Sequence, residues 1–291
     1  MNTRAAGALA GPTPWGAEAL WLQLEALLPG LSIEVLPRVA STNTLLLERA
    51  RAGDVQPCLL VAEEQTQGRG RMGREWRSRA GASLTVSLAL PLAVADWSGL
   101  SLAVGLALAD ALDPLPADPA EGAPRIGLKW PNDLWLLDGP LAAGGGRKLG
   151  GILIETVGAG ASAGPGSPRL AVVGVGLNLL PQPEEGLSQG CACLQELDAQ
   201  ASAPQVLAGV AAPLLRALLR FQAAGFAPLA AAYARRDVLR GRPVSTTQAG
   251  LPEGRAEGVD AQGALLVRHG GLHRVVSGEV SVRPRAAVEA G

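Results

Sequence analysis

The sequence predicts an α+β domain with a mixed sheet and flanking helices, followed by a small β-barrel. Three observations carry this prediction. Apolar strand-like runs between residues 58 and 180 alternate irregularly with helix-like runs, which is typical of a mixed sheet. The stretch 203–234 is rich in Ala and Leu and predicts a pair of helices. After about residue 236, short strand-like runs with glycine-rich turns indicate a barrel of about 50 residues.

The elements of the first domain are predicted from apolar periodicity and from residues that begin or end helices. Leucines at helical spacing predict the first helix, and Ser41 and Gly53 mark the two ends of the second. Strand 83–92 alternates leucine and valine with small polar residues, so we expect it to be half-buried. The predicted helices are 15–28, 41–53, 100–112 and the pair in 203–234, and the predicted strands are 58–64, 83–92, 125–130, 133–139, 148–157 and 170–180.

Composition limits the class of protein. With 291 residues, 48% of them hydrophobic and 18% charged, the chain is expected to build a substantial core. A formal net charge of -1 disfavours a general nucleic-acid binder, which normally carries a basic excess. No apolar run reaches the roughly 20 residues needed to cross a bilayer, and residues 1–16 lack the apolar core of a signal peptide. Cys58, Cys191 and Cys193 are too few and too irregular for a disulfide framework, so we expect a cytoplasmic protein.

Two residue types are scarce. The only histidines, His269 and His273, lie late in the chain, which disfavours a His-based catalytic triad or a His/Cys metal cage. Only two of the 25 basic residues are lysines, Lys129 and Lys148. A chain that otherwise uses arginine is expected to keep lysine where a compact ammonium group is needed, although chance retention is the alternative at both positions.

The segment QGRGRMGREW, residues 67–76, matches the glycine pattern of a dinucleotide-binding turn. However, the residues after it lack apolar periodicity, and the next strand begins by about Ser83, too soon for a helical crossover. What remains is a glycine-rich loop between two strands whose arginines could hold an anion, with a solvated basic loop as the alternative. The arginines of this region are Arg69, Arg71, Arg74, Arg77 and Arg79.

Two further segments place polar residues beside strands. Asp133, in KWPNDLWL, could hold Mg²⁺ on a triphosphate, and an ordinary Asn-Asp turn is the alternative. In RKLGGILIE, Lys148 precedes Gly150-Gly151, where a ligand could approach the backbone. Lys148 and the arginines could together neutralise a carboxylate that attacks an α-phosphate, and also the leaving pyrophosphate. This would be electrostatic catalysis of adenylation without a protein nucleophile.

Taken together, these residues resemble the biotin–protein ligase family, whose members attach biotin to the biotin carboxyl carrier protein of acetyl-CoA carboxylase. The matching segments occur in the family's order from about residue 36 to the end. The resemblance implies a catalytic domain similar to class II aminoacyl-tRNA synthetases, followed by an SH3-like barrel. The segments are STNT, AEEQTQGRGRMGREW, KWPNDLWL, KLGGILIE, VVGVGLNL, GVDAQGALLV and SGEVSVR.

The resemblance also implies a domain organisation and a reaction in two steps. We expect residues 1–35 to form an N-terminal tail and helix, 36–236 the catalytic domain and 237–285 the SH3-like domain. Biotin and MgATP are expected to give biotinyl-5′-AMP. A lysine of the carrier protein then attacks this mixed anhydride and releases AMP.

Residue roles follow from the same resemblance. Arg69 and Arg71 are expected to hold the adenylate phosphate or the biotin carboxylate and to close the loop over it. Lys148 is expected to stabilise the charge that develops between carboxylate and α-phosphate. The expected substrate-binding residues are Ser41, Thr42, Asn43, Gln65, Gly68, Arg69, Arg71, Trp76, Lys148 and Gly151. The expected nucleotide-binding residues are Lys129, Asn132, Asp133, Asn178 and Glu279, with Asp133 also the expected Mg²⁺ ligand.

Two departures from the family matter. The 40 residues that precede STNT are too few for the winged helix-turn-helix of members that double as repressors, so we expect no DNA binding. Cys191 stands where certain bacterial relatives place a tryptophan near adenine. If that tryptophan stacks on the base, its loss removes on the order of 1–3 kcal/mol, and Trp76 is the residue that could replace it.

Two alternative functions stay open. A lipoate–protein ligase resembles the same fold and chemistry. A non-catalytic nucleotide- or RNA-binding protein would use the arginine loop for salt-sensitive binding. We expect biotin and the carrier protein as partners, no membrane association, and a monomer or homodimer.

Overall fold

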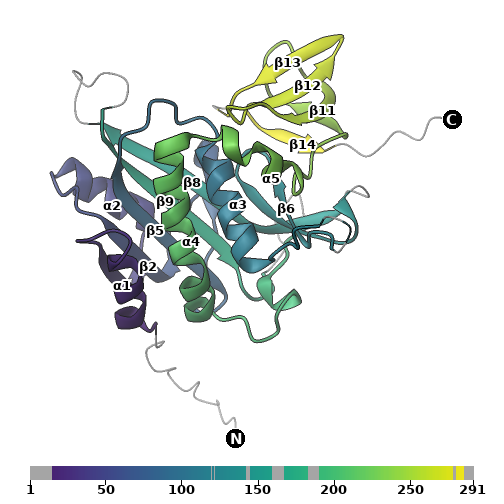
Figure 1. Cartoon of the computed structure of the whole chain (residues 1–291). Helices are drawn as coiled ribbons and strands as arrows, with labels where there is room; N and C mark the ends of the chain where they lie inside the picture. The colour runs from purple at the N-terminus through teal and green to yellow at the C-terminus, as the bar shows by residue number, and fades with distance from the viewer. Residues whose placement is uncertain are drawn as a thin grey trace, which may run out of the picture.

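A seven-stranded mixed sheet forms the centre of the main domain (Figure 1). The computed structural model describes residues 15–118, 120, 122–141, 145–158, 167–182, 190–277 and 280–284. Strands β1 and β2 run parallel, and the other neighbouring pairs of this sheet are antiparallel, which confirms the predicted mixed sheet. In spatial order the strands are β1 (Ser32–Val39), β2 (Cys58–Gln65), β5 (Ser83–Leu92), β9 (Arg169–Asn178), β8 (Gly146–Gly158), β7 (Asp133–Leu137) and β6 (Ile126–Lys129).

Two long helices cover one face of this sheet. Helices α3 (Leu100–Leu112) and α4 (Ala203–Ala224) lie side by side across it (Figure 1), and α1 (Ala17–Glu25) packs beside α4. The strand residues that point toward them are large and apolar, as in the row Val86, Val175 and Ile152, which are register partners. Burying such side chains stabilises the fold by roughly 1.5–3 kcal/mol each.

Helix α4 is, among the described helices, the one long and apolar enough by composition to cross a bilayer. Its buried residues belong to the main core cluster and contact α3 and β5. It is therefore a core helix, and its apolar side faces the sheet.

On the opposite face of the sheet, α2 (Thr42–Arg51) packs against an apolar cluster at one end. Toward the N-terminus of α2 the strand residues become small. Ser87 lies opposite Gly174, and in the next row Thr85, Gly176 and Gly151 are register partners. Because register partners point to the same side of a sheet, these small residues leave a hollow in this face.

The expectation that strand 83–92 is half-buried is wrong. In β5 every residue except Pro91 is buried, including the polar Ser83, Thr85 and Ser87. The physical reason is its central position, with α4 on one face, and on the other α2 and Trp76, whose ring lies against Gly176. The alternation of apolar and small polar residues marks the hollow and not a solvent-exposed face.

Strand β1 was not predicted from the sequence. It is an edge strand with mostly intermediate or exposed residues, and it contains Pro37, so it lacks a continuous apolar signal. The expected division between residues 35 and 36 lies inside β1. The first helix, the Ser41 start of α2 and the turn at Gly53 are where the sequence predicts them.

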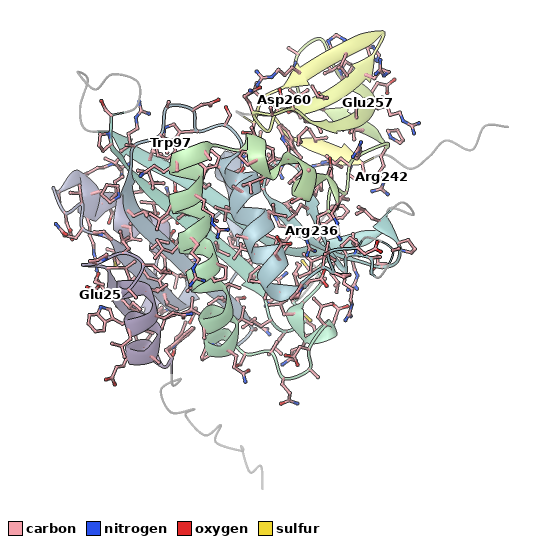
Figure 2. The ribbon with its side chains drawn as sticks, viewed as in Figure 1. Glu25, Trp97, Arg236, Arg242, Glu257 and Asp260 are labelled. Atoms are coloured by element: carbon pink, nitrogen blue, oxygen red, sulfur yellow. The ribbon has the colours of Figure 1, made fainter. Side chains whose placement is uncertain are left out.

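Arg236 ties the end of the helical layer to the sheet. Its side chain is fully buried and pairs with Asp110 and Asp113, each at 2.9 Å, and it also donates to the Ile126 carbonyl at 2.9 Å. Figure 2 shows it between α3 and the strands near the second domain. A short helix, α5 (Ala230–Ala234), precedes it.

The C-terminal residues form a five-stranded antiparallel sheet, which confirms the predicted small β domain. It docks beside β6 and α3 (Figure 1). Trp130 donates its indole N–H to the Gly263 carbonyl at 3.0 Å. A Cβ on Gly263 would lie 2.7 Å from the Gly99 Cα, so the two backbones meet closely. The strands are β10 (Pro243–Thr246), β11 (Glu253–Val259), β12 (Leu265–His269), β13 (Gly271–Val275) and β14 (Val282–Pro284).

Candidate active site

A cavity of about 480 Å³ occupies the hollow in the sheet. The segment 68–76, called the arginine hairpin below, and residues 280–283 of the C-terminal domain complete its walls. The predicted site residues that line it are Ser41, Thr42, Asn43, Gln65, Arg69, Arg71, Trp76, Lys129, Asn132, Asp133, Lys148, Gly151 and Asn178. Cys191 lines it too, Gly68 does not, and Glu279 lies outside the described residues.

One end of the cavity is formed by the first turn of α2. Ser41 caps this helix by accepting from the Thr44 backbone N–H at 3.4 Å, which is why the helix begins here. Gln65, at the end of β2, accepts from the backbone N–H of Thr42 at 2.7 Å. This end therefore presents hydroxyl and amide groups that are held in place by the fold.

The arginine hairpin consists of β3 (Gly68–Arg69), the turn η1 (Arg71–Gly73) and β4 (Glu75–Trp76). A Cβ on Gly68 would lie 2.3 Å from the Trp76 carbonyl oxygen, so the pairing of the hairpin requires glycine there. A Cβ on Gly176 would lie 2.4 Å from the Trp76 ring. The hairpin thus closes over the sheet because both contact points lack a side chain.

Arg71 connects the hairpin to both domains. Its guanidinium donates to Asn132 Oδ1 at 3.3 Å and to the Ser277 carbonyl at 3.0 Å. Burial lowers the pKa of Arg71 below its usual value, partly offset by the attraction of Asp133. Arg74 reaches the C-terminal domain as well, donating to Ser281 Oγ at 3.3 Å. These contacts describe a loop that already bridges the cavity mouth.

Asp133 lies between two lysines. Lys148 Nζ is 2.7 Å from Asp133 Oδ1, and Lys129 Nζ is 3.5 Å from Oδ2. Burial opposes the charged carboxylate, but the attraction of Lys148 and Lys129 outweighs it and holds the pKa of Asp133 below its usual value. Burial also lowers the pKa of Lys129, an effect that the attraction of Asp133 only partly offsets. Two ammonium groups against one carboxylate leave a positive excess that favours an anionic ligand.

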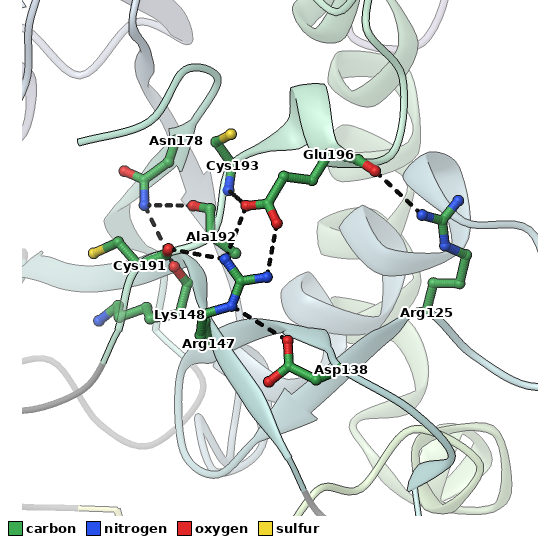
Figure 3. Close-up of polar contacts among 9 residues, drawn as sticks. All are labelled: Arg125, Asp138, Arg147, Lys148, Asn178, Cys191, Ala192, Cys193 and Glu196. Carbon is green, nitrogen blue, oxygen red and sulfur yellow. Dashed lines mark hydrogen bonds and ion pairs between the residues drawn. The ribbon is translucent and has the colours of Figure 1, made fainter.

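A network behind Lys148 was not predicted from the sequence (Figure 3). Arg147 forms a forked pair with Glu196 at 2.7 and 3.1 Å and also reaches Asp138 at 3.2 Å. Glu196 accepts from the Cys193 backbone N–H at 3.0 Å. The hydrogen bond from Arg147 is the main cause that lowers the pKa of Glu196. The network holds in place the segment around Cys191, whose backbone pairs with that of Lys148.

Asn178 is hydrogen-bonded to the same two segments, around Lys148 and Cys191. Its amide N–H group donates to the Ala192 carbonyl at 3.0 Å and to the Lys148 carbonyl at 3.4 Å (Figure 3). Asn132 likewise donates its amide to the Ile152 carbonyl at 2.8 Å. Both amides therefore hold the walls of the cavity together, and their expected contacts with the nucleotide stay predictions.

The side chains around Asp133 do not form a metal site by themselves. In the ranges that the structure covers, no group of three or more His, Cys, Asp or Glu side chains could hold a metal ion. Both oxygens of Asp133 are paired with lysines. A cation at Asp133 would have to replace a lysine contact and take most of its ligands from a bound phosphate.

Comparisons with known proteins agree with this geometry. Residues 35–178 match the biotin/lipoate A/B protein ligase family, and residues 241–283 match the biotin protein ligase C terminal domain. The "Biotin--[acetyl-CoA-carboxylase] ligase" of Mycobacterium tuberculosis is 38% identical over 272 residues, which cover 90% of this chain and 89% of the relative. The "Bifunctional ligase/repressor BirA" of Escherichia coli is 35% identical over 271 residues, which cover 90% of this chain and 77% of the relative.

A solved structure shows the same fold. The biotin protein ligase from Aquifex aeolicus in complex with biotin and ATP superposes with a TM-score of 0.68 at 25% identity, covering 87% of this chain and 99% of that protein. The family match, the relatives and this fold lead to one conclusion. The chain belongs to the biotin/lipoate A/B protein ligase family, and within it to the biotin protein ligases.

Proposed function

We propose that this protein activates biotin with ATP to biotinyl-5′-AMP and then transfers biotin to a lysine of the biotin carboxyl carrier protein of acetyl-CoA carboxylase. The observation that carries the proposal is that Arg71, Lys129 and Lys148 come from three separate segments and line one cavity. The polar end at Thr42 and Gln65 lies in the same cavity. A long acid with a polar head and a carboxylate, bound beside a nucleotide, suits this arrangement.

In the first step a biotin carboxylate oxygen attacks the α-phosphorus of ATP. The bond from the α-phosphorus to the bridging oxygen breaks, and pyrophosphate leaves with the electron pair, so no proton is transferred. Negative charge gathers on the phosphate oxygens, and cationic groups near it are worth most where water is excluded. We assign this role to Lys148, Arg69 and Arg71.

In the second step the carrier lysine attacks the acyl carbon of biotinyl-5′-AMP. An amide bond forms, the acyl–phosphate bond breaks and AMP leaves, while the amine loses one proton. The hairpin is expected to keep the reactive anhydride from water until the carrier arrives.

Nucleotide and metal contacts are part of the proposal. We expect Lys129, Asn132 and Asn178 beside the nucleotide, and Mg²⁺ to arrive on the triphosphate, with Asp133 supplying at most one ligand after lysine contacts rearrange. Trp76 lines the cavity and remains the aromatic group proposed to replace the tryptophan expected at Cys191.

The test uses purified protein with biotin, MgATP and a carrier domain, followed by intact-mass measurement. We expect one biotin on one carrier lysine and release of AMP, and no addition to a carrier whose target lysine is replaced by arginine. Lipoate in place of biotin is the matched substrate control. Transfer of lipoate instead of biotin would favour a lipoate–protein ligase, and salt-sensitive RNA binding without AMP formation would favour the non-catalytic alternative.

A further inference from the structure

Four side chains beneath the cavity form a continuous hydrogen-bond relay, defined here as Thr42, Ser87, Asn43 and Glu155. Thr42 Oγ1 and Ser87 Oγ lie 2.6 Å apart, and Ser87 Oγ is 2.6 Å from Asn43 Oδ1. Asn43 Nδ2 donates to Glu155 Oε2 at 2.9 Å and to the Leu153 carbonyl at 3.2 Å. Thr42, Ser87 and Asn43 are at most 3% exposed.

The direction of every hydrogen bond in the relay is determined. A carboxylate and a carbonyl only accept, so Glu155 and Leu153 require the amide N–H group of Asn43. Asn43 then turns its carbonyl oxygen to Ser87, and the single hydroxyl hydrogen of Ser87 is used there. Ser87 must therefore accept from Thr42.

This direction leaves Thr42 Oγ1 without a hydrogen to donate to a ligand. Gln65 Oε1 lies 3.1 Å from Thr42 Oγ1 as a second acceptor for the same hydroxyl hydrogen, and it also takes the backbone N–H of Thr42. Thr42 lines the cavity, so its hydroxyl can offer a ligand only lone pairs. Asn43 has its own amide engaged inside the relay, which makes a positioning role more fitting for it than direct binding.

The backbone holds the relay in this arrangement. Ser41 caps α2, which places Thr42 and Asn43 in the first helical turn. Gly174 lies opposite Ser87 in the sheet, and a Cβ there would lie 2.3 Å from Asn43 Oδ1. The amide of Asn43 thus occupies space that any other residue at 174 would fill.

We propose that Ser87, Asn43 and Glu155 are positioning residues that fix Thr42 Oγ1 as a hydrogen-bond acceptor, so that the cavity selects a head group with an N–H at this point. The inference rests on the proposed function, in which the head group is the cyclic urea of biotin. A ring oxygen in place of that N–H would set two acceptors against each other, and sites of this kind reject such analogues strongly.

The test compares biotin with its two cyclic carbamate analogues, each with one ring N–H replaced by oxygen. The readout is kcat/KM for ligand-dependent ATP–pyrophosphate exchange in the unsubstituted protein, Ser87→Ala and Thr85→Val. Thr85 is the matched control, because its buried hydroxyl lies on the same strand and face but donates to the Ala62 carbonyl at 2.7 Å, outside the relay.

We expect the unsubstituted protein to prefer biotin over one carbamate by on the order of 100-fold or more. Ser87→Ala removes the acceptor that holds the Thr42 hydrogen, so the hydroxyl can turn between Gln65 Oε1 and the ligand. The preference should therefore fall about tenfold or more, whereas Thr85→Val should keep it. Should Ser87→Ala not fold, Ser87→Cys fills nearly the same space with a poor acceptor and is expected to act likewise.

If Ser87→Ala kept the original preference for biotin over the carbamate and only its rate with biotin fell, the inference would be overturned. The relay would then only stabilise the fold. Absence of biotin-dependent exchange in the unsubstituted protein would overturn the proposed function and the inference with it.

Discussion

Lys148 and Asp133 form a 2.7 Å ion pair across two neighbouring strands at the edge of the cavity. Lys129 contacts the other oxygen of the same carboxylate, so three charged groups share one site with a net positive charge. Lys148 keeps about a third of its side-chain surface accessible, whereas Lys129 is almost fully buried. Lys148 is therefore the ammonium group that can turn toward an entering phosphate.

Replacing Lys148 tests its assigned role in catalysis. Lys148→Ala should lower the rate of biotin-dependent adenylation by on the order of 100-fold or more, because it removes a positioned charge from the transition state. The fold should survive, since Lys129 still pairs with Asp133. Quenched time courses of biotinyl-5′-AMP formation measure the rate, and circular dichroism checks the fold. Lys148→Arg is the charge-keeping control, and normal adenylation in Lys148→Ala would remove this residue from its role.

Arg71→Ala should let biotinyl-5′-AMP escape faster. The variant loses the hydrogen bonds to Asn132 and Ser277 that join the hairpin to both domains. Charged hydrogen bonds are worth about 1.5–3 kcal/mol, so an increase of about tenfold or more in the release rate is expected. Filter-binding with labelled intermediate measures it. Arg79→Ala, an exposed residue of the same basic region, should release at the original rate, and equal retention in all three proteins would count against a clamping hairpin.

Gly176→Ala should weaken biotin binding. The new methyl group would lie 2.4 Å from the Trp76 ring, so the tryptophan and its hairpin must move. We expect a dissociation constant raised by about tenfold, measured by titration calorimetry, because overpacking of this size costs roughly 1–3 kcal/mol. Gly158→Ala, where a Cβ meets nothing within 4 Å, is the control. Equal affinity in the two variants would show that the Trp76 position does not matter for binding.

Arg236→Met should destabilise the catalytic domain. Its buried guanidinium is paired with Asp110 and Asp113, and removing it leaves carboxylates without their partner. Breaking a buried pair costs about 3–5 kcal/mol in the free energy of unfolding, which urea titration measures. Arg235→Met, which removes one charged hydrogen bond to the Pro116 carbonyl, should cost less, about 1.5 kcal/mol. Similar losses in both would contradict the view of Arg236 as a buried anchor.

The buried carboxyl of Asp237 should make the free energy of unfolding depend on pH. Burial raises the pKa of Asp237 to about 6, above its ordinary value near 4, so the folded state binds this proton more tightly than the unfolded state. Stability from this group is therefore full below pH about 4 and is lost as pH rises through 6, by at most about 3 kcal/mol.

Asp237→Asn should remove that decline, because the amide keeps the acceptor for the Leu239 backbone N–H at 2.9 Å. The measurement is the difference in unfolding free energy between variant and unsubstituted protein at pH 4.5 and pH 7.5. The difference cancels other groups such as Asp133, whose lowered pKa acts with the opposite sign. A difference that does not change with pH would contradict the assignment.

Much of the fold is visible in the sequence because it rests on local signals. Apolar runs predict β2, β8, β9 and α3, and the residue pair Ser41 and Gly53 predicts the ends of α2. Edge strand β1 has no such signal, since exposure and Pro37 break its apolar pattern. The prediction that β5 is half-buried was wrong because the elements that cover its second face are distant from it in the sequence.

The candidate site divides in the same way. Charged and glycine-rich segments, such as those of Arg71, Asp133 and Lys148, stand out in the sequence, and the structure collects them around one cavity. The partners Ser87 and Glu155 do not stand out, because their contacts depend on strand register and not on spacing along the chain. Gly174 and Gly176 of VGVGLN are two residues apart, and the reason for glycine at each is visible only in the structure, where Asn43 and Trp76 approach their backbone closely.

The central claim is that cations from separate segments meet at one activated carboxyl–phosphate junction. A crystal structure with a non-hydrolysable analogue of biotinyl-5′-AMP tests it most directly. We expect the nitrogen atoms of Arg69, Arg71 and Lys148 to lie about 2.7–3.2 Å from the phosphate or the adjoining acyl oxygens. A structure in which the analogue binds in the cavity while Lys148 stays on Asp133 and both arginines point to solvent would contradict the account.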